Sequence, residues 1–225
     1  MLYSLRKAVY ANFAKKSKLF SRKNLYSDVI SVISSLPEGS SVLNVGSGGE
    51  VAEVAFAAAK GKLLKIVSMD IDINRKPDIV ADVCAMPFES ESWDAVILVE
   101  VLEHVKEPWK AVEEILRVLK TGGKLVLTSP FIYPIHELEH DYYRYTKHGL
   151  RFLLQKFNEV TITERNNYIE AINVLYVRSI ADPSERARVF AIMSYYSGFC
   201  FLNFLFGSGI KSKNLTTGYR VLAVK

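Results

Sequence analysis

The residues best placed to do chemistry stand directly after short apolar runs. Val42-Leu43-Asn44-Val45 leads into Gly46-Ser47-Gly48-Gly49, and a helix-forming stretch follows from Val51 to Lys60. Glycines let the backbone take positive φ angles and approach a ligand, and the helix start beyond them offers unpaired N–H groups. A tight connection between a strand and a helix has the same composition, so this turn alone is weak evidence for a binding site.

Acidic residues end three later apolar runs, namely Asp70, Asp82 and Glu100. In an open parallel sheet, ligands bind outside the carboxyl ends of the strands. A carboxylate there accepts hydrogen bonds from both hydroxyls of a ribose, and Asp82 with Val83 offers an acceptor and an apolar wall to an adenine. Each acid alone also fits a helix cap, but four ligand-type elements in order favour a nucleoside site.

The elements that position these residues alternate between two patterns. Strand-like runs cover 41–45, 65–69, 78–81, 93–99, 124–128, 160–164 and 219–224, and helix-like patterns cover 26–36, 51–60, 109–119 and 147–156. Such alternation implies right-handed crossovers and a sheet covered on both faces. We therefore predict an α/β fold, a Rossmann-like three-layer sandwich with a mostly parallel seven-stranded sheet and helices on both faces.

From Ser41 to Thr128 the chain resembles the class I S-adenosylmethionine (SAM)-dependent methyltransferases. The resemblance rests on Val42–Glu50, Met69–Asp72, Ala81–Phe88, Trp93–Val105 and Arg117–Leu125. It implies SAM as cofactor, S-adenosylhomocysteine as product, and a cofactor site made of Asn44, Gly46, Ser47, Gly48, Asp70, Ile71, Asp82, Val83, Val99 and Glu100. In this family Asp70 would hold the ribose, Ile71 and Asp82 would contact the adenine, and the glycines with Glu100 would line the methionine end.

Two residues depart from the family pattern. Asn44 stands where the family usually has an acidic residue, and Glu50 stands where it often has a third glycine. These departures leave open a non-catalytic SAM-binding partner subunit. An NAD enzyme is a further alternative, because its glycine-rich loop also follows the first strand, but the full G-x-G-x-x-G spacing is absent and we prefer SAM.

Histidine and acidic side chains gather after the fifth strand-like run. A hydroxyl acceptor must lose its proton during methyl transfer, and a histidine or carboxylate can take it. We expect His136 or His140 to act as the base and Asp141 to orient a histidine. His104, in the segment before this run, is expected to brace the start of a helix.

The same segment carries the resemblance further. A proline, a histidine and then Asp-Tyr-Tyr-Arg-Tyr-Thr are typical of a methyltransferase subgroup found among glycan and cell-envelope biosynthesis proteins. The resemblance implies O-methylation of a small, glycan-like or lipid-linked acceptor, with Tyr142 and Arg144 shaping the acceptor pocket. A nitrogen- or carbon-directed small-molecule methyltransferase is the alternative.

A zinc-hydrolase pattern overlaps these histidines. His136-Glu137-Leu138-Glu139-His140 matches H-E-x-x-H, which needs a helix that puts both histidines on one face. The segment lies instead at a strand end in a Rossmann-like series, so we expect no metal.

The distribution of charge limits the kinds of partner that the protein is expected to have. Residues 1–27 carry seven Lys and Arg and no acid, so that, with +5 for the whole chain, residues 28–225 sum to −2. Since a nucleic-acid enzyme usually spreads positive charge over its binding face, no nucleic-acid partner is expected. We divide the chain into a basic amphipathic extension (1–27) and a methyltransferase domain (28–225), without a prediction of oligomeric state.

An apolar stretch near the end, Val189–Ile210, contains no charged residue. It is long enough to span a membrane, but spanning would separate two strand-like segments that should pair. We expect an apolar helical insertion at about 169–214, which packs on the domain or contacts the inner face of the membrane as part of a peripheral association. The two distant cysteines, Cys84 and Cys200, fit no disulfide spacing and suit a cytoplasmic protein.

Overall fold

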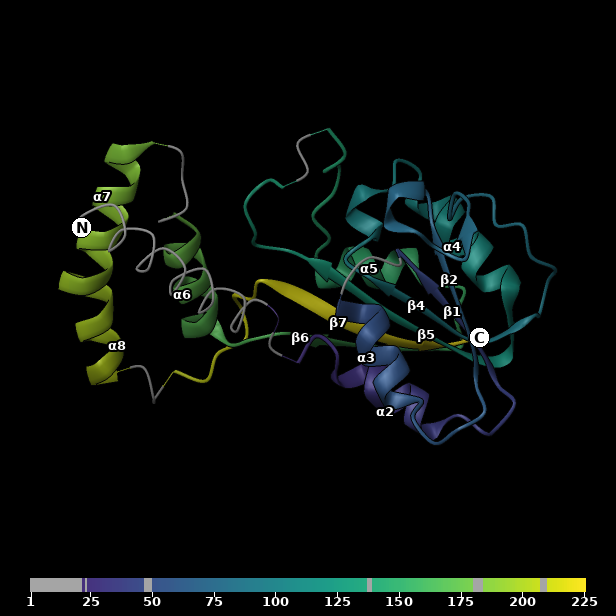
Figure 1. Ribbon diagram of the computed structural model, residues 1–225. Coiled ribbons are helices and arrows are strands. Elements are labelled where there is room, and N and C mark those ends of the chain that lie inside the picture. Colours follow the sequence, from purple (N-terminus) through teal and green to yellow (C-terminus); the bar gives the residue numbers. More distant parts are fainter. Residues whose placement is uncertain (1–21, 23, 47–49, 137–138, 180–183, 207–209) are drawn as a thin grey trace. The chain divides into compact units, whose positions relative to one another are not determined.

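The computed structural model describes residues 22, 24–46, 50–136, 139–179, 184–206 and 210–225 (Figure 1). Most of the predicted extension 1–27, and Ser47 and Gly48 of the predicted site, lie outside these residues. The chain divides into two compact units. We call them the sheet unit (24–131, 136–163 and 219–225) and the helical unit (132–135 and 164–218).

Within the described residues seven strands form one sheet in the order β3-β2-β1-β4-β5-β7-β6. The strands are β1 (Ser41–Val45), β2 (Lys65–Asp70), β3 (Ile79–Val80), β4 (Trp93–Val99), β5 (Leu119–Pro130), β6 (Glu159–Glu164) and β7 (Gly218–Val224). β1 to β5 pair in parallel. The amide of Asn158 donates to Val224 and that of Arg165 donates to Gly218, so β6 and β7 are antiparallel. The predicted mostly parallel, seven-stranded α/β fold is confirmed.

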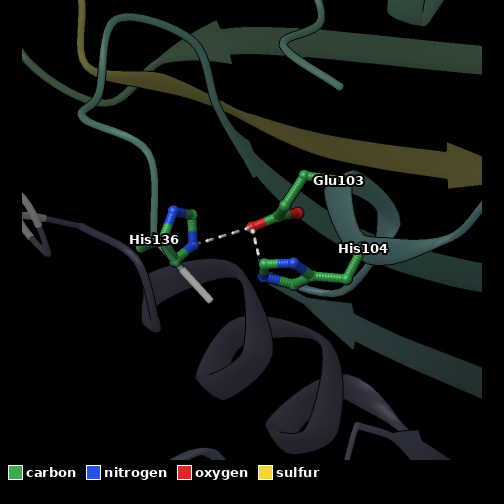
Figure 2. A group of neighbouring side chains, drawn as sticks. All are labelled: Glu103, His104 and His136. Atoms are coloured by element: carbon green, nitrogen blue, oxygen red, sulfur yellow. Dashed lines mark ion pairs between the residues drawn. The ribbon is translucent and has the colours of Figure 1, made fainter. Parts of the chain in front are cut away.

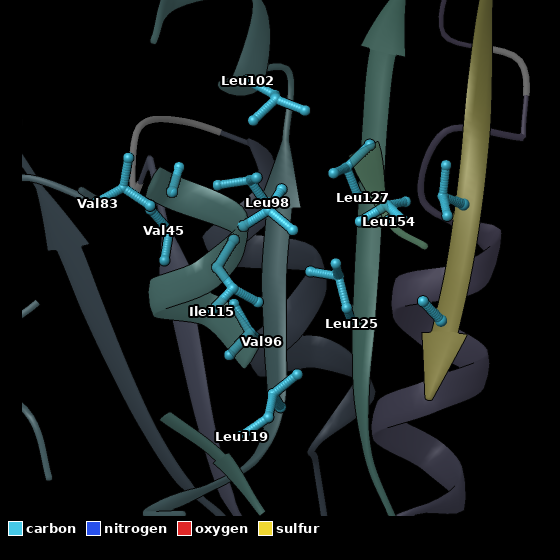
Figure 3. Packing of buried hydrophobic residues seen from close by; sticks show 14 of the residues in the cluster. Val45, Val83, Val96, Leu98, Leu102, Ile115, Leu119, Leu125, Leu127 and Leu154 are labelled. Carbon is cyan, nitrogen blue, oxygen red and sulfur yellow. The ribbon is translucent and has the colours of Figure 1, made fainter. Parts of the chain in front are cut away.

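Helices cover both faces of the sheet: α2 (Ser27–Ser35) and α3 (Glu50–Ala58) on one face, α4 (Pro108–Val118) and α5 (Lys147–Leu153) on the other. Side chains of a strand point alternately to the two faces of the sheet, and because helices cover both faces, the apolar strands are buried on both sides. Leu43 and Val45 pack in the same cluster as Ile115 of α4, whereas Val42 packs with Val29 of α2. Figure 3 shows the first cluster, with Leu98, Leu125 and Leu127 along the central strands.

β5 begins earlier than the sequence predicts. We expected a helix to end at Gly122-Gly123 and a strand to begin at Lys124, but Leu119 already pairs with Trp93. The register then shifts before Lys124 pairs with Ala95, and Gly122 has φ +77°. A glycine with positive φ is typical of a β-bulge, which explains why the two glycines do not end the strand.

The helical unit contains α6 (Tyr168–Ser179), α7 (Glu185–Ser194), a π-helical turn (Tyr195–Phe199) and α8 (Cys200–Phe206). These helices lie in the predicted insertion, whose residues 180–183 and 207–209 are outside the described part. A small core forms around Val177, Ala191 and Tyr195. Among the described residues, every helix is too short or too polar to cross a membrane.

Candidate active site

The carboxyl ends of β1, β2 and β4 adjoin one another at one edge of the sheet. Val45 is in register with Met69 on one side and with Leu98 on the other. Of the predicted ligand residues, Gly46 and Asp70 directly follow Val45 and Met69, and Glu100 lies two residues after Leu98. We call this group, together with Asp82 beyond β3, the cofactor edge.

Gly46 has a backbone that only glycine adopts easily. Its φ is +75°, and its amide donates to the carbonyl of Met69 at 2.9 Å. A Cβ built on Gly46 would overlap the side chain of Val101. Gly46 is therefore required by both its conformation and its close neighbour.

Asp70 is buried and keeps acceptor capacity. Its Oδ1 accepts from the amide of Asp72 at 2.9 Å, while its Oδ2 lies 3.9 Å from Nε of Arg75, beyond hydrogen-bond distance. Ile71, the next residue, is 71% exposed. A carboxylate oxygen beside an exposed apolar side chain suits a ribose with its attached base.

Asp82 and Glu100 are the other two acids of the cofactor edge. Asp82 Oδ1 accepts from the amide of Cys84 at 2.8 Å, and Val83 is buried in the core. Glu100 follows the buried Val99 with φ +55°.

Thr128 of β5 holds Glu100 in this unusual conformation. The carbonyl of Thr128 accepts from the amide of Glu100 at 3.1 Å, and the hydroxyl of Thr128 donates to Glu100 Oε1 at 3.0 Å. Because a positive φ is costly outside glycine, a buried neighbour that fixes it indicates a position set by function.

Asn44 is one of the two departures from the family pattern, and it lies at the end of β1. Its side chain is 1% exposed, and neither its amide nitrogen nor its oxygen has a hydrogen-bond partner within the described chain. A buried amide without partners costs free energy unless a bound molecule supplies them. The residues present therefore fit a polar ligand at the end of β1.

Beyond β5, residues 136–146 form what we call the acceptor loop, in which Asp141 is the centre of a charged cluster. Both nitrogens of the Arg144 fork donate to Asp141, at 2.5 and 2.6 Å, and the amide of His136 donates at 2.9 Å. These contacts, the Arg144 hydrogen bonds first, lower the pKa of Asp141 to about 2. Asp141 also lies 3.4 Å from His136 Nδ1, so the carboxylate holds both the backbone and the ring of His136.

His140 lies apart from this cluster. Its exposed ring is 3.2 Å from the hydroxyl of Tyr142, which is itself 38% exposed. Residues 136, 139 and 140 are not helical, and 137–138 lie outside the described residues. The described part of the loop thus lacks the helix that the H-E-x-x-H alternative needs.

The acceptor loop is anchored to η2 (Leu102–His104), a 3₁₀ turn just beyond β4. The amides of Tyr142 and Tyr143 donate to the carbonyl of Glu103 at 3.0 and 3.2 Å. The hydroxyl of Tyr145 donates to the Leu102 carbonyl at 3.1 Å, and His104 Nδ1 lies 2.8 Å from the His140 carbonyl. These contacts join two sequence motifs that are far apart in the chain.

This junction brings Glu103, His104 and His136 together (Figure 2). Our sequence analysis assigned His104 only a bracing role and gave none to Glu103. The available signal was a Glu-His pair immediately beyond a strand end, but its partner His136 is recognisable only in three dimensions. The sequence therefore missed two members of this cluster.

Comparisons with known proteins agree with the fold. A family model described as "Methyltransferase domain" matches residues 43–127. The demethylmenaquinone methyltransferase of Renibacterium salmoninarum is 36% identical over 111 residues, covering 45% of each chain. The ubiquinone biosynthesis O-methyltransferase of Xanthomonas axonopodis pv. citri is 30% identical over 107 residues, covering 41% of this chain and 44% of that one. The chain thus spans less than half the length of these curated relatives.

Solved structures show the same fold. A SAM-dependent methyltransferase from Archaeoglobus fulgidus superposes with a TM-score of 0.56 at 16% identity, covering 98% of this chain and 94% of that one. The phosphoethanolamine N-methyltransferase 2 of Haemonchus contortus, in complex with SAM, has a TM-score of 0.56 at 18% identity, covering 90% and 52%. These structures show the fold, and the family model shows that residues 43–127 are similar to a methyltransferase domain.

Proposed function

We propose that this protein transfers a methyl group from SAM to a small acceptor molecule. The observation that carries the proposal is the placement of Gly46, Asp70 and Glu100 at three adjoining strand ends, inside the segment that matches the methyltransferase family. The activity of the whole protein is inferred from this site, since the chain covers under half of its relatives.

The cofactor edge would hold SAM as follows. Asp70 accepts from the ribose, Asp82 with Ile71 and Val83 receives the adenine, and Asn44 and Glu100 face the methionine end together with the glycine turn. When bound, SAM supplies an electrophilic methyl group and leaves as S-adenosylhomocysteine. Holding both reactants in line is much of the catalysis in such a displacement.

His136 is our choice for the group that takes the acceptor's proton. Asp141 accepts a hydrogen bond from its backbone amide and lies 3.4 Å from its Nδ1, and its other ring nitrogen, Nε2, lies 4.0 Å from Glu103. The ring of His140 is exposed and contacts Tyr142, so His140 is less firmly placed. Arg144 acts through Asp141, and Tyr142 borders the acceptor.

An oxygen acceptor is the finer part of the proposal. A hydroxyl acceptor needs a base to remove its proton, and the His136–Asp141 pair can supply that base. The relatives include both a ubiquinone biosynthesis O-methyltransferase and a demethylmenaquinone methyltransferase, so carbon methylation is the alternative. Neither relative supports the glycan-type acceptor that the sequence suggested, and we place an apolar ring-bearing acceptor ahead of it. Transfer of an isotope-labelled methyl group to a small quinol, followed by NMR of the product, distinguishes O–CH₃ from C–CH₃.

Calorimetric titration with SAM and S-adenosylhomocysteine tests the cofactor site. We expect saturable binding that weakens at least tenfold in Asp70→Ala and Asp82→Ala, since each variant loses a charge-assisted hydrogen bond. Asp72→Ala is the matched control, because Asp72 lies two residues from Asp70 but caps only the local turn (Ile73–Arg75). A folded wild-type protein that binds neither compound would favour the non-catalytic partner subunit.

Peripheral membrane contact is a second property that the structure favours. On α7 and α8, Phe190 is 74% and Phe204 is 85% exposed; Arg186 and Arg188 lie in the first turns of α7, and Lys211 and Lys213 follow α8 in the sequence. Exposed apolar side chains beside basic residues bind anionic lipid surfaces. We expect the protein to float with anionic liposomes at low salt. The double variant Phe190→Ser/Phe204→Ser should not float, whereas Phe56→Ser, which alters an exposed phenylalanine of α3, should.

A further inference from the structure

We propose that Glu103, His104 and His136 form a binding site for one divalent transition-metal cation. The three residues come from two elements, η2 and the acceptor loop, and all belong to the sheet unit. Each offers one ligand atom, and these atoms lie within 4.8 Å of one another. Two imidazoles and one carboxylate are a ligand set that leaves other coordination positions open.

The three ligand atoms converge. Glu103 Oε1 lies 3.8 Å from Nε2 of His104 and 4.0 Å from Nε2 of His136, and Figure 2 shows both rings turned toward the carboxylate. Metal–ligand bonds of about 2.0–2.2 Å place neighbouring ligand atoms roughly 3–3.5 Å apart. The ligand atoms would therefore have to approach one another by about 1–2 Å, which rotation about the side-chain χ angles supplies.

Both histidines are oriented in the way that metal ligands are. In metal sites the second ring nitrogen of a histidine is usually held by a carbonyl or a carboxylate, which fixes the tautomer and the ring. Here His104 Nδ1 lies 2.8 Å from the His140 carbonyl, and His136 Nδ1 lies 3.4 Å from Asp141 Oδ2. His136 Nδ1 also lies 3.5 Å from Nη2 of Arg144, and the Nε2 atoms of both rings face Glu103.

Burial and charge favour a cation at this point. The Glu103 side chain is 0% exposed, and a buried carboxylate is stabilised by positive charge nearby. Arg144 supplies a positive charge, but it is engaged by Asp141. If both imidazoles are neutral, the charges of Glu103, Asp141 and Arg144 sum to −1. The cluster would therefore attract a divalent cation and not repel it.

The ligand types select the cation. Imidazole nitrogen suits Zn²⁺, Co²⁺, Mn²⁺ and Fe²⁺, whereas Mg²⁺ and Ca²⁺ prefer oxygen ligands. The side chains of His104 and His136 are 17% and 31% exposed, so solvent and a small acceptor can reach an open coordination position.

A cation here would change how the acceptor is activated, a consequence that rests on the proposed function. A hydroxyl bound to the cation has a lowered pKa and loses its proton to water. The cation would occupy the Nε2 atom of His136 that otherwise acts as the base. The two roles of His136 therefore exclude each other in one molecule, and metal binding decides between them.

The test is a titration of the full chain, freed of metal with a chelator, with Co²⁺ and Zn²⁺. We expect one Co²⁺ per chain, visible in the d–d absorption spectrum and in calorimetry, and no comparable binding of Mg²⁺. His104→Ala and His136→Ala should each weaken Co²⁺ binding at least tenfold. The matched control is His148→Ala, which removes an exposed histidine of α5 that lies outside the cluster.

Two further measurements separate the possible failures. Glu103→Gln keeps the shape of the buried side chain, and urea unfolding reports whether each variant still folds. The site is wrong if folded wild-type protein binds no Co²⁺, or if His136→Ala and His148→Ala bind it equally. SAM titration of the same proteins is independent: lost SAM binding with intact Co²⁺ binding would refute the proposed function and leave the metal site standing.

Discussion

The cofactor edge and the acceptor loop belong to the same sheet unit, but different contacts hold them. At the cofactor edge the backbone does most of the positioning: Gly46 donates to Met69, Glu100 donates to Thr128, and the strands are in parallel register. In the acceptor loop, two backbone amides donate to the Glu103 carbonyl, and side chains add further contacts, above all the Arg144 fork on Asp141.

This difference matters for how the two regions can vary. A backbone cradle constrains size and conformation at a few positions and tolerates many side chains elsewhere, which suits a cofactor that many enzymes share. A loop held by an ion pair and tyrosine hydrogen bonds can change its acceptor by changing a few residues. The comparison predicts that substitutions in the two regions will fail for different physical reasons.

The largest effect is expected for Gly46→Ala. A left-handed alanine costs about 1–2 kcal/mol, and overlap with Val101 adds about 1–3 kcal/mol, so we expect a loss of about 3 kcal/mol in the free energy of unfolding. Gly61→Ala is the control, because Gly61 has φ +86° but open space around its Cβ position. Urea unfolding measures both, and equal losses would show that the approach of Val101 is unimportant.

Asp141→Asn tests, through the pH dependence of the free energy of unfolding, whether the Asp141 carboxylate stabilises the acceptor loop. The pKa of Asp141 falls from 3.8 to about 2 on folding, so its stabilisation is present above pH 4 and is lost as the pH falls toward 2. The shift corresponds to about 2 kcal/mol. We therefore expect the wild-type protein to lose about 2 kcal/mol more than Asp141→Asn between pH 6 and pH 2. Parallel urea midpoints in the two proteins would contradict a loop held by this carboxylate.

Asn44→Val tests the one side chain of the cofactor edge whose polar atoms are buried without a hydrogen-bond partner in the described chain. Removing a buried amide without partners should raise the free energy of unfolding by about 1–2 kcal/mol. The same change should weaken SAM binding, because the amide is then lost to the ligand. A variant that is more stable and binds SAM normally would show that Asn44 does not face the cofactor.

Thr128→Val should have the smallest effect, about 1 kcal/mol. The buried hydroxyl loses its bond to Glu100 Oε1 and its share of the Glu100 amide, but that amide still donates to the Thr128 carbonyl. Thr121→Val is the control, since Thr121 makes a similar bond to Glu91 at the exposed start of the same strand. We expect thermal unfolding to show a clear change for Thr128→Val and almost none for the control. The reverse ranking would mean that Glu100 does not need Thr128.

The cofactor edge could be predicted because its signals are local. Apolar runs of strand length, each followed by glycine or an acid, identify strand ends without knowledge of the rest of the chain. Gly46, Asp70 and Glu100 lie at adjoining strand ends for this reason. Local signals fail where pairing with a distant strand decides the structure. Leu119 pairs with Trp93 and so begins β5, although the glycines after it predicted that the strand begins at Lys124.

By itself, the sequence determined the alternating elements, the α/β class and which residues stand at the strand ends, because periodicity and strand-end position are encoded within a few neighbouring residues. Only the tertiary structure decided that β7 runs antiparallel to β6, and that Glu103 and His104 meet His136. That meeting depends on loop amides that donate to the Glu103 carbonyl from about forty residues away. No local pattern specifies such a contact, since the loop conformation follows from the surface on which it packs.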